Sequence, residues 1–238
     1  MRVVTFNIRH GAPPGGCPDI DALARTIAGM NADAVALQEV DRRVFRSGFT
    51  DQTARIAERT GLVSQFGRAR RIGPMSGYGN ALLTRTEPSR VDVLELRSLG
   101  EQRVAVIAEV VTDEGPATLV SVHLQNRRSG QPPQALSQLD QLLDVVSCRP
   151  EPWVVMGDFN LRPEIVLPKL AEAGLSPASV EPTFPAVDPR IAIDWIAVRG
   201  MNVVSVDLPD VRLSDHRPLV VDLQDSRTPN FAPTGAEG

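Results

Sequence analysis

Several strand-like segments of this sequence carry, at or near one end, a side chain that could take part in catalysis. Each one alone has a structural explanation, such as an Asn or Asp that caps a turn. Their repeated occurrence, which includes two of the three histidines, indicates a shared site. The segments are VVTFN, AVALQE, ATLVSVH, WVVMGDFN, AIDWIAV and LSDHRPLVV, and the side chains are Asn7, Glu39, His123, Asp158, Asn160, Asp194, Asp215 and His216.

This set has the chemistry that cleavage of a phosphate ester requires. The carboxylates of Glu39, Asp158 and Asp215, with amide oxygens, form a hard oxygen site of the kind that Mg²⁺ or Mn²⁺ prefers. Such an ion neutralises phosphate and stabilises the leaving oxygen. A histidine paired with a buried carboxylate favours the imidazolium, which can contact phosphate oxygens. Zinc is less favoured, because the chain has few histidines and no HExxH motif.

A carboxylate inside an apolar segment adds to this interpretation. Asp194 lies between Ile193 and Trp195, and burying its charge is unfavourable unless another group pairs with it. A simple turn residue would not need such a partner. We therefore expect Asp194 to be part of the site.

The elements that must position these side chains follow from the apolar patterns. Many short strands and few helices in a chain of 238 residues predict two packed sheets covered by helices on the outside. Apolar runs such as AVAL and WVVM suit central strands that are buried on both faces. We expect helices over 20–30, 51–60, 134–146 and 164–173, and strands over 3–8, 34–38, 62–66, 78–84, 91–96, 103–111, 117–123, 153–156, 193–198, 203–207 and 218–223.

The composition is that of a globular protein, with 42% hydrophobic and 23% charged residues. The start of the chain has no apolar signal-peptide region, and no apolar stretch approaches the roughly 20 residues that span a bilayer. We therefore expect a cytoplasmic protein with no transmembrane segment. The two cysteines, Cys17 and Cys148, form no metal-binding or redox motif. The net charge of −4 gives no global attraction to nucleic acid, although arginines cluster at 42–46, 68–71 and 127–128.

The motifs TFNIRHG, ALQEVD, YGNALLTR, SVHLQ, MGDFN, IDWIAV and LSDHRPLVV, in this order, resemble the endonuclease/exonuclease/phosphatase superfamily with the deoxyribonuclease-I-like fold. They cover residues 3 to about 223, with MGDFN and LSDHRPLVV the most specific. The resemblance implies an α/β (α+β) fold, a four-layer αββα sandwich of two packed mixed β-sheets flanked by helices. We expect a single catalytic domain over 1–224 and a flexible tail over 225–238.

The resemblance also implies a role for each metal-site residue. Glu39 would be the principal ligand of Mg²⁺ or Mn²⁺, with Asn7 beside it and Asp215 completing or supporting the site. Asn80, in the motif YGNALL, would border the cleft and bind substrate. Whether one metal ion or two act is left open.

Among the catalytic residues, the resemblance implies that Asp158 orients the attacking water and takes its proton. Asn160 would hold phosphate or the nucleophile. Asp194 would pair with His216, which faces the phosphate, and His123 would contact another phosphate oxygen or assist the leaving group. The identity of the general base stays open at this point.

The expected activity is metal-dependent hydrolysis of phosphodiester bonds by an activated water, carried out by a monomer. The alternatives are a phosphomonoesterase of the inositol-phosphatase type and a catalytically silent binding module on the same fold. The substrate could be a nucleic acid, a small phosphodiester or a lipid headgroup. Nucleic acid is slightly favoured, although the low aromatic content of 4% limits base stacking.

Overall fold

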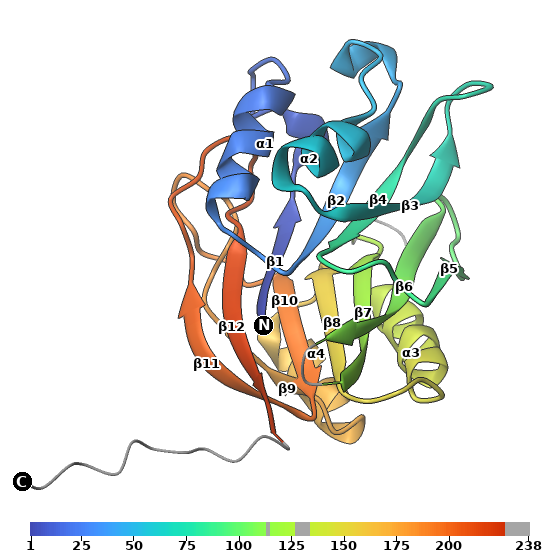
Figure 1. The fold of residues 1–238 in the computed structure, drawn as a ribbon, viewed down its shortest axis with the longest axis vertical. Coiled ribbons are helices and arrows are strands. Elements are labelled where there is room, and N and C mark those ends of the chain that lie inside the picture. The colour runs from blue at the N-terminus through green and yellow to red at the C-terminus, as the bar shows by residue number, and fades with distance from the viewer. Residues whose placement is uncertain (113–114, 127–133, 227–238) are drawn as a thin grey trace, which may run out of the picture.

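Apolar strands from the whole length of the chain form two six-stranded sheets that face each other (Figure 1). The computed structural model describes residues 1–112, 115–126 and 134–226. Within these residues, both sheets contain parallel and antiparallel neighbours, so both are mixed sheets, as the family resemblance implies.

The first sheet, here called sheet A, has the strand order β11-β12-β1-β2-β4-β3. Its central pair β1 and β2 is parallel, and the other neighbours are antiparallel. In chain order its strands are β1 (Arg2–Asn7), β2 (Ala34–Arg42), β3 (Val63–Arg71), β4 (Gly77–Thr84), β11 (Met201–Asp207) and β12 (Leu219–Asp225).

The second sheet, here called sheet B, has the strand order β5-β6-β7-β8-β10-β9. Its central pair β7 and β8 is again parallel. In chain order its strands are β5 (Arg90–Leu96), β6 (Arg103–Thr112), β7 (Gly115–His123), β8 (Trp153–Asp158), β9 (Ser176–Pro177) and β10 (Asp194–Arg199).

Four α-helices cover the outer faces of the sheets in the described part of the chain. Helix α1 (Ile20–Gly29) begins at Asp19, whose carboxylate accepts the Ala22 N–H, and α2 (Gln52–Thr60) begins at Asp51 in the same way. Gly61, at a φ of +71°, ends α2 in the left-handed conformation that glycine adopts readily. The other helices are α3 (Ala135–Val146) and α4 (Pro163–Glu172), and two short 3₁₀ helices are η1 (Arg9–Gly11) and η2 (Phe45–Ser47).

In the described part of the chain, three apolar cores separate the four layers. One lies between α1, α2 and sheet A, where Leu23 and Ile56 pack near Phe6. The second lies between the two sheets, and the third joins sheet B to α3 and α4 through residues such as Leu139. Removing this much apolar surface from water is the main stabilising contribution to the fold. The predicted αββα sandwich is confirmed.

Several strands extend beyond their predicted ends, and β3 does so the furthest, to Arg71 instead of residue 66. Strand β2 continues past Gln38 to Arg42. A bulge between Leu37 and Val40 shifts the register with β4, and pairing resumes at Val40. Strand β8 continues through Asp158 instead of ending at Met156. Strand β12 continues through Asp225, which is buried, instead of ending at Leu223.

Two regions named in the sequence predictions fall beyond this description. Residues 227–238 of the expected tail, and the arginine pair at 127–128, lie outside the described residues. Among the residues that the structure does describe, none of the helices combines the length and the apolar character needed to cross a bilayer.

Candidate active site

The register of sheet B brings three of the predicted residues to one position on adjacent strands. Asp158 ends β8, and its partner on the parallel strand β7 is His123. Its partner on the antiparallel strand β10 is Asp194. Residues opposite each other on neighbouring strands lie close together and on the same face. Strand pairing therefore sets a carboxylate between a histidine and a second carboxylate.

Gly157 allows this close alignment of β7 and β8. Its φ is +154°, and a Cβ at this position would lie 1.9 Å from the carbonyl oxygen of Val122 on the neighbouring strand. A side chain would force the two strands apart. Glycine is therefore required just before Asp158.

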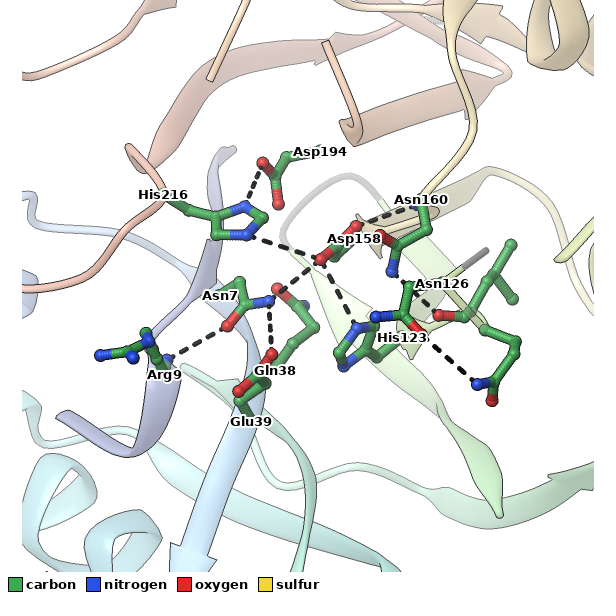
Figure 2. A network of polar contacts seen from close by, with 12 residues as sticks. Asn7, Arg9, Gln38, Glu39, His123, Asn126, Asp158, Asn160, Asp194 and His216 are labelled. Carbon is green, nitrogen blue, oxygen red and sulfur yellow. Dashed lines mark hydrogen bonds and ion pairs between the residues drawn. The ribbon is translucent and has the colours of Figure 1, made fainter. Parts of the chain in front are cut away.

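Asp158 accepts hydrogen bonds at both of its carboxylate oxygens (Figure 2). The backbone N–H of Asn160 donates to Oδ1 at 2.9 Å, and the amide Nδ2 of Asn7 donates to Oδ2 at 3.0 Å. Nε2 of His123 lies 3.5 Å from Oδ2, and Nε2 of His216 lies 3.8 Å from it. One carboxylate oxygen therefore faces nitrogen atoms from three different strands or loops.

The pKa of Asp158 is raised to about 7, first because the group is buried and second because the charge of Asp194 is near. His216 and the hydrogen bond from Asn7 act in the opposite direction and lower the pKa. The carboxylate can therefore gain or lose a proton near neutral pH. This is the range in which a general base is most effective.

His216 is held by Asp194 on the side away from Asp158. Its Nδ1 lies 2.8 Å from Oδ2 of Asp194, and the Thr183 hydroxyl donates to the same oxygen. The ring of Phe184 packs on the imidazole at a centroid distance of 4.8 Å. Burial alone lowers the pKa of His216, but the charge and hydrogen bond of Asp194, followed by the charge of Asp158, raise it to about 10. His216 is therefore an imidazolium at neutral pH.

His123 has the opposite charge state, because a buried arginine faces it. Nη1 of Arg103 lies 3.1 Å from Nδ1 of His123. A guanidinium can only donate, so Nδ1 accepts and Nε2, on the side of Asp158, carries the proton. Burial first, then the charges of Arg103 and His216, lower the pKa of His123 well below its ordinary value. The site therefore contains one charged and one neutral histidine.

Glu39 lies at the edge of this network on sheet A. The bulge in β2 gives it a left-handed φ of +59°, an uncommon conformation for a residue with a side chain. Its Oε1 lies 3.3 Å from Nδ2 of Asn7, the same nitrogen that contacts Asp158. Two carboxylates therefore converge on one amide group, and such an oxygen donor set fits a hard divalent cation.

Asn7 presents its NH₂ group to these carboxylates. Its Oδ1 accepts the backbone N–H of Arg9 at 3.1 Å, which fixes the orientation of the amide. Asn7 thus holds Glu39 and Asp158 together, and its role as a metal ligand stays a prediction. Asp215, which is partly exposed, lies with Oδ2 at 3.4 Å from Nε of Arg9.

A second group of possible metal ligands contains Asp158, Asp194 and His216, whose ligand atoms lie within 4.8 Å of one another in the described part of the chain. An imidazolium has no lone pair to offer a metal ion. Since His216 is charged and paired with Asp194, this group is better explained as an ion-pair network. The Glu39 edge is the better candidate for a cation.

Two predicted residues have mainly structural contacts. Asn80 is buried on β4, and its Nδ2 donates to the carbonyl of Val104 on β6, which links the two sheets. No hydrogen bond joins it to the other predicted residues in the ranges that the structure covers. Nδ2 of Asn160 donates to the carbonyl of Leu124 beyond β7. The substrate-binding roles of Asn80 and Asn160 stay predictions.

Arg103 was not found by sequence reasoning. It begins the apolar strand β6, where a charged first residue is ordinarily exposed, yet it is only 4% exposed. The same signal that identified Asp194, a charge beside an apolar run, is present in QRVAVIA but is weaker because it lies at the end of the run.

Comparison with solved structures identifies similar folds. An endonuclease/exonuclease/phosphatase from Beutenbergia cavernae is 23% identical with a TM-score of 0.79, over 94% of this chain and 71% of that one. The catalytic domain of human nocturnin with a bound sulfate anion is 21% identical with a TM-score of 0.72, over 95% and 93%. A mannosyl-6-phosphatase from Bacteroides thetaiotaomicron is 15% identical with a TM-score of 0.72, over 94% and 99%. At these identities the likeness shows the fold.

Sequence comparison gives the family. No curated protein matches the chain significantly. The model of the Endonuclease/Exonuclease/phosphatase family matches residues 4–216, a range that begins in β1 and ends at His216. The chain therefore belongs to the Endonuclease/Exonuclease/phosphatase family.

Proposed function

We propose that this protein is a divalent-cation-dependent phosphoesterase that hydrolyses phosphodiester bonds. The observation that carries the proposal is the arrangement around Asp158. The carboxyl group of Asp158 has a pKa of about 7, and its Oδ2 faces the charged His216 and the N–H of the neutral His123. Membership in the family supports hydrolysis of a phosphate ester as the general class of reaction.

In this mechanism Asp158 accepts the proton of the attacking water at Oδ2. Its Oδ1 is fixed by the backbone N–H of Asn160, so the carboxylate has a defined orientation before substrate binds. Because its pKa is near 7, the group is largely ionised at slightly alkaline pH and still basic enough to take a proton. Asn160 acts in this scheme as a positioning residue.

The two histidines stabilise the charge on the phosphoryl oxygens. His216 donates from Nε2 as an imidazolium, which Asp194 orients and keeps protonated. His123 donates from Nε2 as a neutral imidazole, which Arg103 holds in that tautomer. Preorganised donors of this kind stabilise a transition state without reorganising during the reaction.

Glu39 is proposed as the principal ligand of Mg²⁺ or Mn²⁺, with Asp215 and Asn7 supporting it. The ion would neutralise phosphate charge and stabilise the leaving oxygen. Nδ2 of Asn7 contacts both Glu39 and Asp158. It would therefore keep the proposed metal ligand at a fixed distance from the proposed base.

The substrate and the setting of the reaction belong to the proposal as well. Nucleic acid is the first substrate class to test, followed by small phosphodiesters and lipid headgroups. We propose that the protein acts as a cytoplasmic monomer, which gel filtration with light scattering and fractionation of the source cells would test.

Hydrolysis of bis(p-nitrophenyl) phosphate tests the proposal. The purified protein is assayed with Mg²⁺ or Mn²⁺, with EDTA, and with p-nitrophenyl phosphate in place of the diester. We expect turnover of the diester that needs the metal and exceeds turnover of the monoester. Faster hydrolysis of the monoester would favour the phosphomonoesterase alternative. No hydrolysis of either ester or of DNA and RNA with any divalent metal would refute the proposal.

A further inference from the structure

A pocket of about 510 Å³ opens beside Glu39, between β2, β3, β4 and the turn η1. The arginines at its wall are Arg9, Arg46 and Arg70, and His10, Tyr78 and Glu101 also line it. Glu39 also lines it. The pocket therefore adjoins the edge at which we place the cation, and it is large enough for more than a single ion.

Arg46 is rigidly placed and still faces solvent. Its Nε and Nη2 donate to the two carboxylate oxygens of Asp41, both at 2.8 Å, and the side chain of Asp41 is fully buried. The guanidinium also lies 5.5 Å from the centroid of the Tyr78 ring. The remaining nitrogen, Nη1, has no hydrogen bond to any residue whose placement is described, so it can bind a ligand, and 47% of the side chain is exposed.

Arg70 supplies a positive charge that no acid among the described residues neutralises. It is exposed on β3, opposite Tyr78 in the strand register. Across the residues with a described placement, it makes no ion pair and no side-chain hydrogen bond. A single unpaired arginine at a surface is ordinary, but this one lines a pocket with two other arginines.

Arg9 connects the pocket to the active site. Nε of Arg9 lies 3.4 Å from Oδ2 of Asp215, and its backbone N–H binds Asn7 (Figure 2). Arg9 and His10 have left-handed φ values of +44° and +49°. Such strain at residues with side chains persists where the surrounding structure holds it, often at functional sites.

The acids near the pocket have partners of their own. Asp41 is paired with Arg46, and Oε2 of Glu101 lies 3.7 Å from Nη2 of Arg103. Glu39 faces the amide of Asn7 and the proposed cation. Arg46 and Arg9 are paired with Asp41 and Asp215, so Arg70 is the guanidinium of this pocket without an acidic partner among the described residues, and planar guanidinium groups suit phosphate oxygens in particular.

We propose that this pocket binds a second phosphate group of the substrate, one that is not cleaved. The inference rests on the proposed function, because it extends the same site, and it specifies the substrate class as a phosphodiester with a further phosphate nearby. A nucleic acid backbone and a small bisphosphorylated diester both carry this group.

Substrates that differ by one phosphate test the pocket. For the nucleic acid source, kcat/KM is measured for the dinucleotide TpT and for TpT phosphorylated at its 5′ or 3′ end. For the small-molecule source, glycerophosphoglycerol is compared with its terminally phosphorylated form. We expect at least one phosphorylated substrate to be preferred by about tenfold or more, roughly 1.4 kcal/mol. Preference in one series alone assigns the pocket to that source.

Two matched variants show where the preference arises. Arg70→Gln should remove most of the preference for the extra phosphate. Arg68→Gln removes the same charge from the same strand at an exposed residue outside the pocket lining, and it should retain the preference. Equal rates on both members of each pair, or an equal loss of preference in the two variants, would overturn the proposal.

Binding distinguishes failure of the pocket from failure of the proposed function. Thymidine 3′,5′-bisphosphate and thymidine 5′-monophosphate are titrated calorimetrically into the protein with Mg²⁺. Tighter binding of the bisphosphate, weakened by Arg70→Gln and not by Arg68→Gln, supports the pocket even if no diester is hydrolysed. Equal affinities for the two nucleotides overturn it even if bis(p-nitrophenyl) phosphate is turned over.

Discussion

Nδ1 of His216 lies 2.8 Å from Oδ2 of Asp194, while Nε2 of the same ring lies 3.8 Å from Oδ2 of Asp158. The imidazole of His216 therefore lies between two buried carboxylates, one at each ring nitrogen. Asp194 keeps the ring charged and oriented, and Asp158 lies beside the proposed phosphate site. The assignment of the base, of the phosphate contact and of the charge state depends on this relationship.

The pairing of His216 makes stability depend on pH. Its pKa is raised in the folded protein from 6.5 to about 10, so the pair's contribution is complete below pH 6.5 and is lost as the pH rises to about 10. A shift of this size corresponds to at most roughly 5 kcal/mol. We expect the unfolding free energy to fall between pH 7 and pH 10, and Asp194→Asn to remove most of that fall.

Urea unfolding of both proteins across this pH range measures the effect. Asp144→Asn, at an exposed position on α3, is the control and should keep the pH dependence of the original protein. Identical pH dependence with and without Asp194 would show that the carboxylate does not hold the charge of His216.

Arg103 should determine the tautomer of His123. With Arg103 present, NMR of the ring nitrogens should show a neutral His123 that is protonated at Nε2, and with only three histidines the signals can be assigned. In Arg103→Met the donor is lost, so both tautomers should be populated and kcat should fall roughly 10- to 100-fold. Arg103→Lys should largely restore the tautomer. An unchanged tautomer in Arg103→Met would contradict this role.

Gly157 should be intolerant of any side chain. Gly157→Ala places a Cβ against the Val122 carbonyl at a φ of +154°, so we expect the unfolding free energy to fall by at least about 2 kcal/mol. Gly29→Ala is the matched control, because Gly29 lies in α1 with nothing within 4 Å of the added Cβ. It should be neutral or stabilising by up to about 1 kcal/mol. Similar unfolding free energies for the two variants would show that β7 and β8 are not as tightly aligned as described.

Glu39 should control metal affinity without changing the fold. In Glu39→Gln an NH₂ group replaces one carboxylate oxygen and the negative charge is lost. The dissociation constant for Mn²⁺, measured by calorimetry, should therefore rise at least about tenfold. Glu58→Gln, at an exposed position on α2, should bind Mn²⁺ as the original protein does. Retention of full affinity in Glu39→Gln would place the cation elsewhere.

The fold was largely predictable because apolar periodicity and turn residues act locally. The strand WVVM and the helix after Asp51 follow from their own residues, and the family motifs supplied the order of the layers. Strand ends were less predictable. Residues such as Asp158 and Asp225 are polar, and only pairing with neighbouring strands shows that they continue the sheet.

That several candidate residues lie close together was predictable from the sequence, but their charge states were not. Asp158 and His123 end the parallel strands β8 and β7, which deliver their ends to the same edge of sheet B, while His216 precedes β12 of sheet A. Their charge states depend on burial and on partners distant in sequence such as Arg103, which the local pattern indicates only weakly. Asp158 fits both interpretations of the MGDFN motif, as a residue that caps a turn and as a residue of the site. Its Oδ1 makes the local turn bond to Asn160, and its Oδ2 faces the site.

The most direct test of the account is the rate of diester hydrolysis after Asp158 loses its ability to accept a proton. Asp158→Asn keeps the shape of the side chain, and folding and Mn²⁺ affinity are measured alongside kcat. The account predicts a kcat on bis(p-nitrophenyl) phosphate that is lower by at least about 100-fold, with the protein folded and metal still bound. A folded, metal-binding Asp158→Asn variant with undiminished kcat would contradict it.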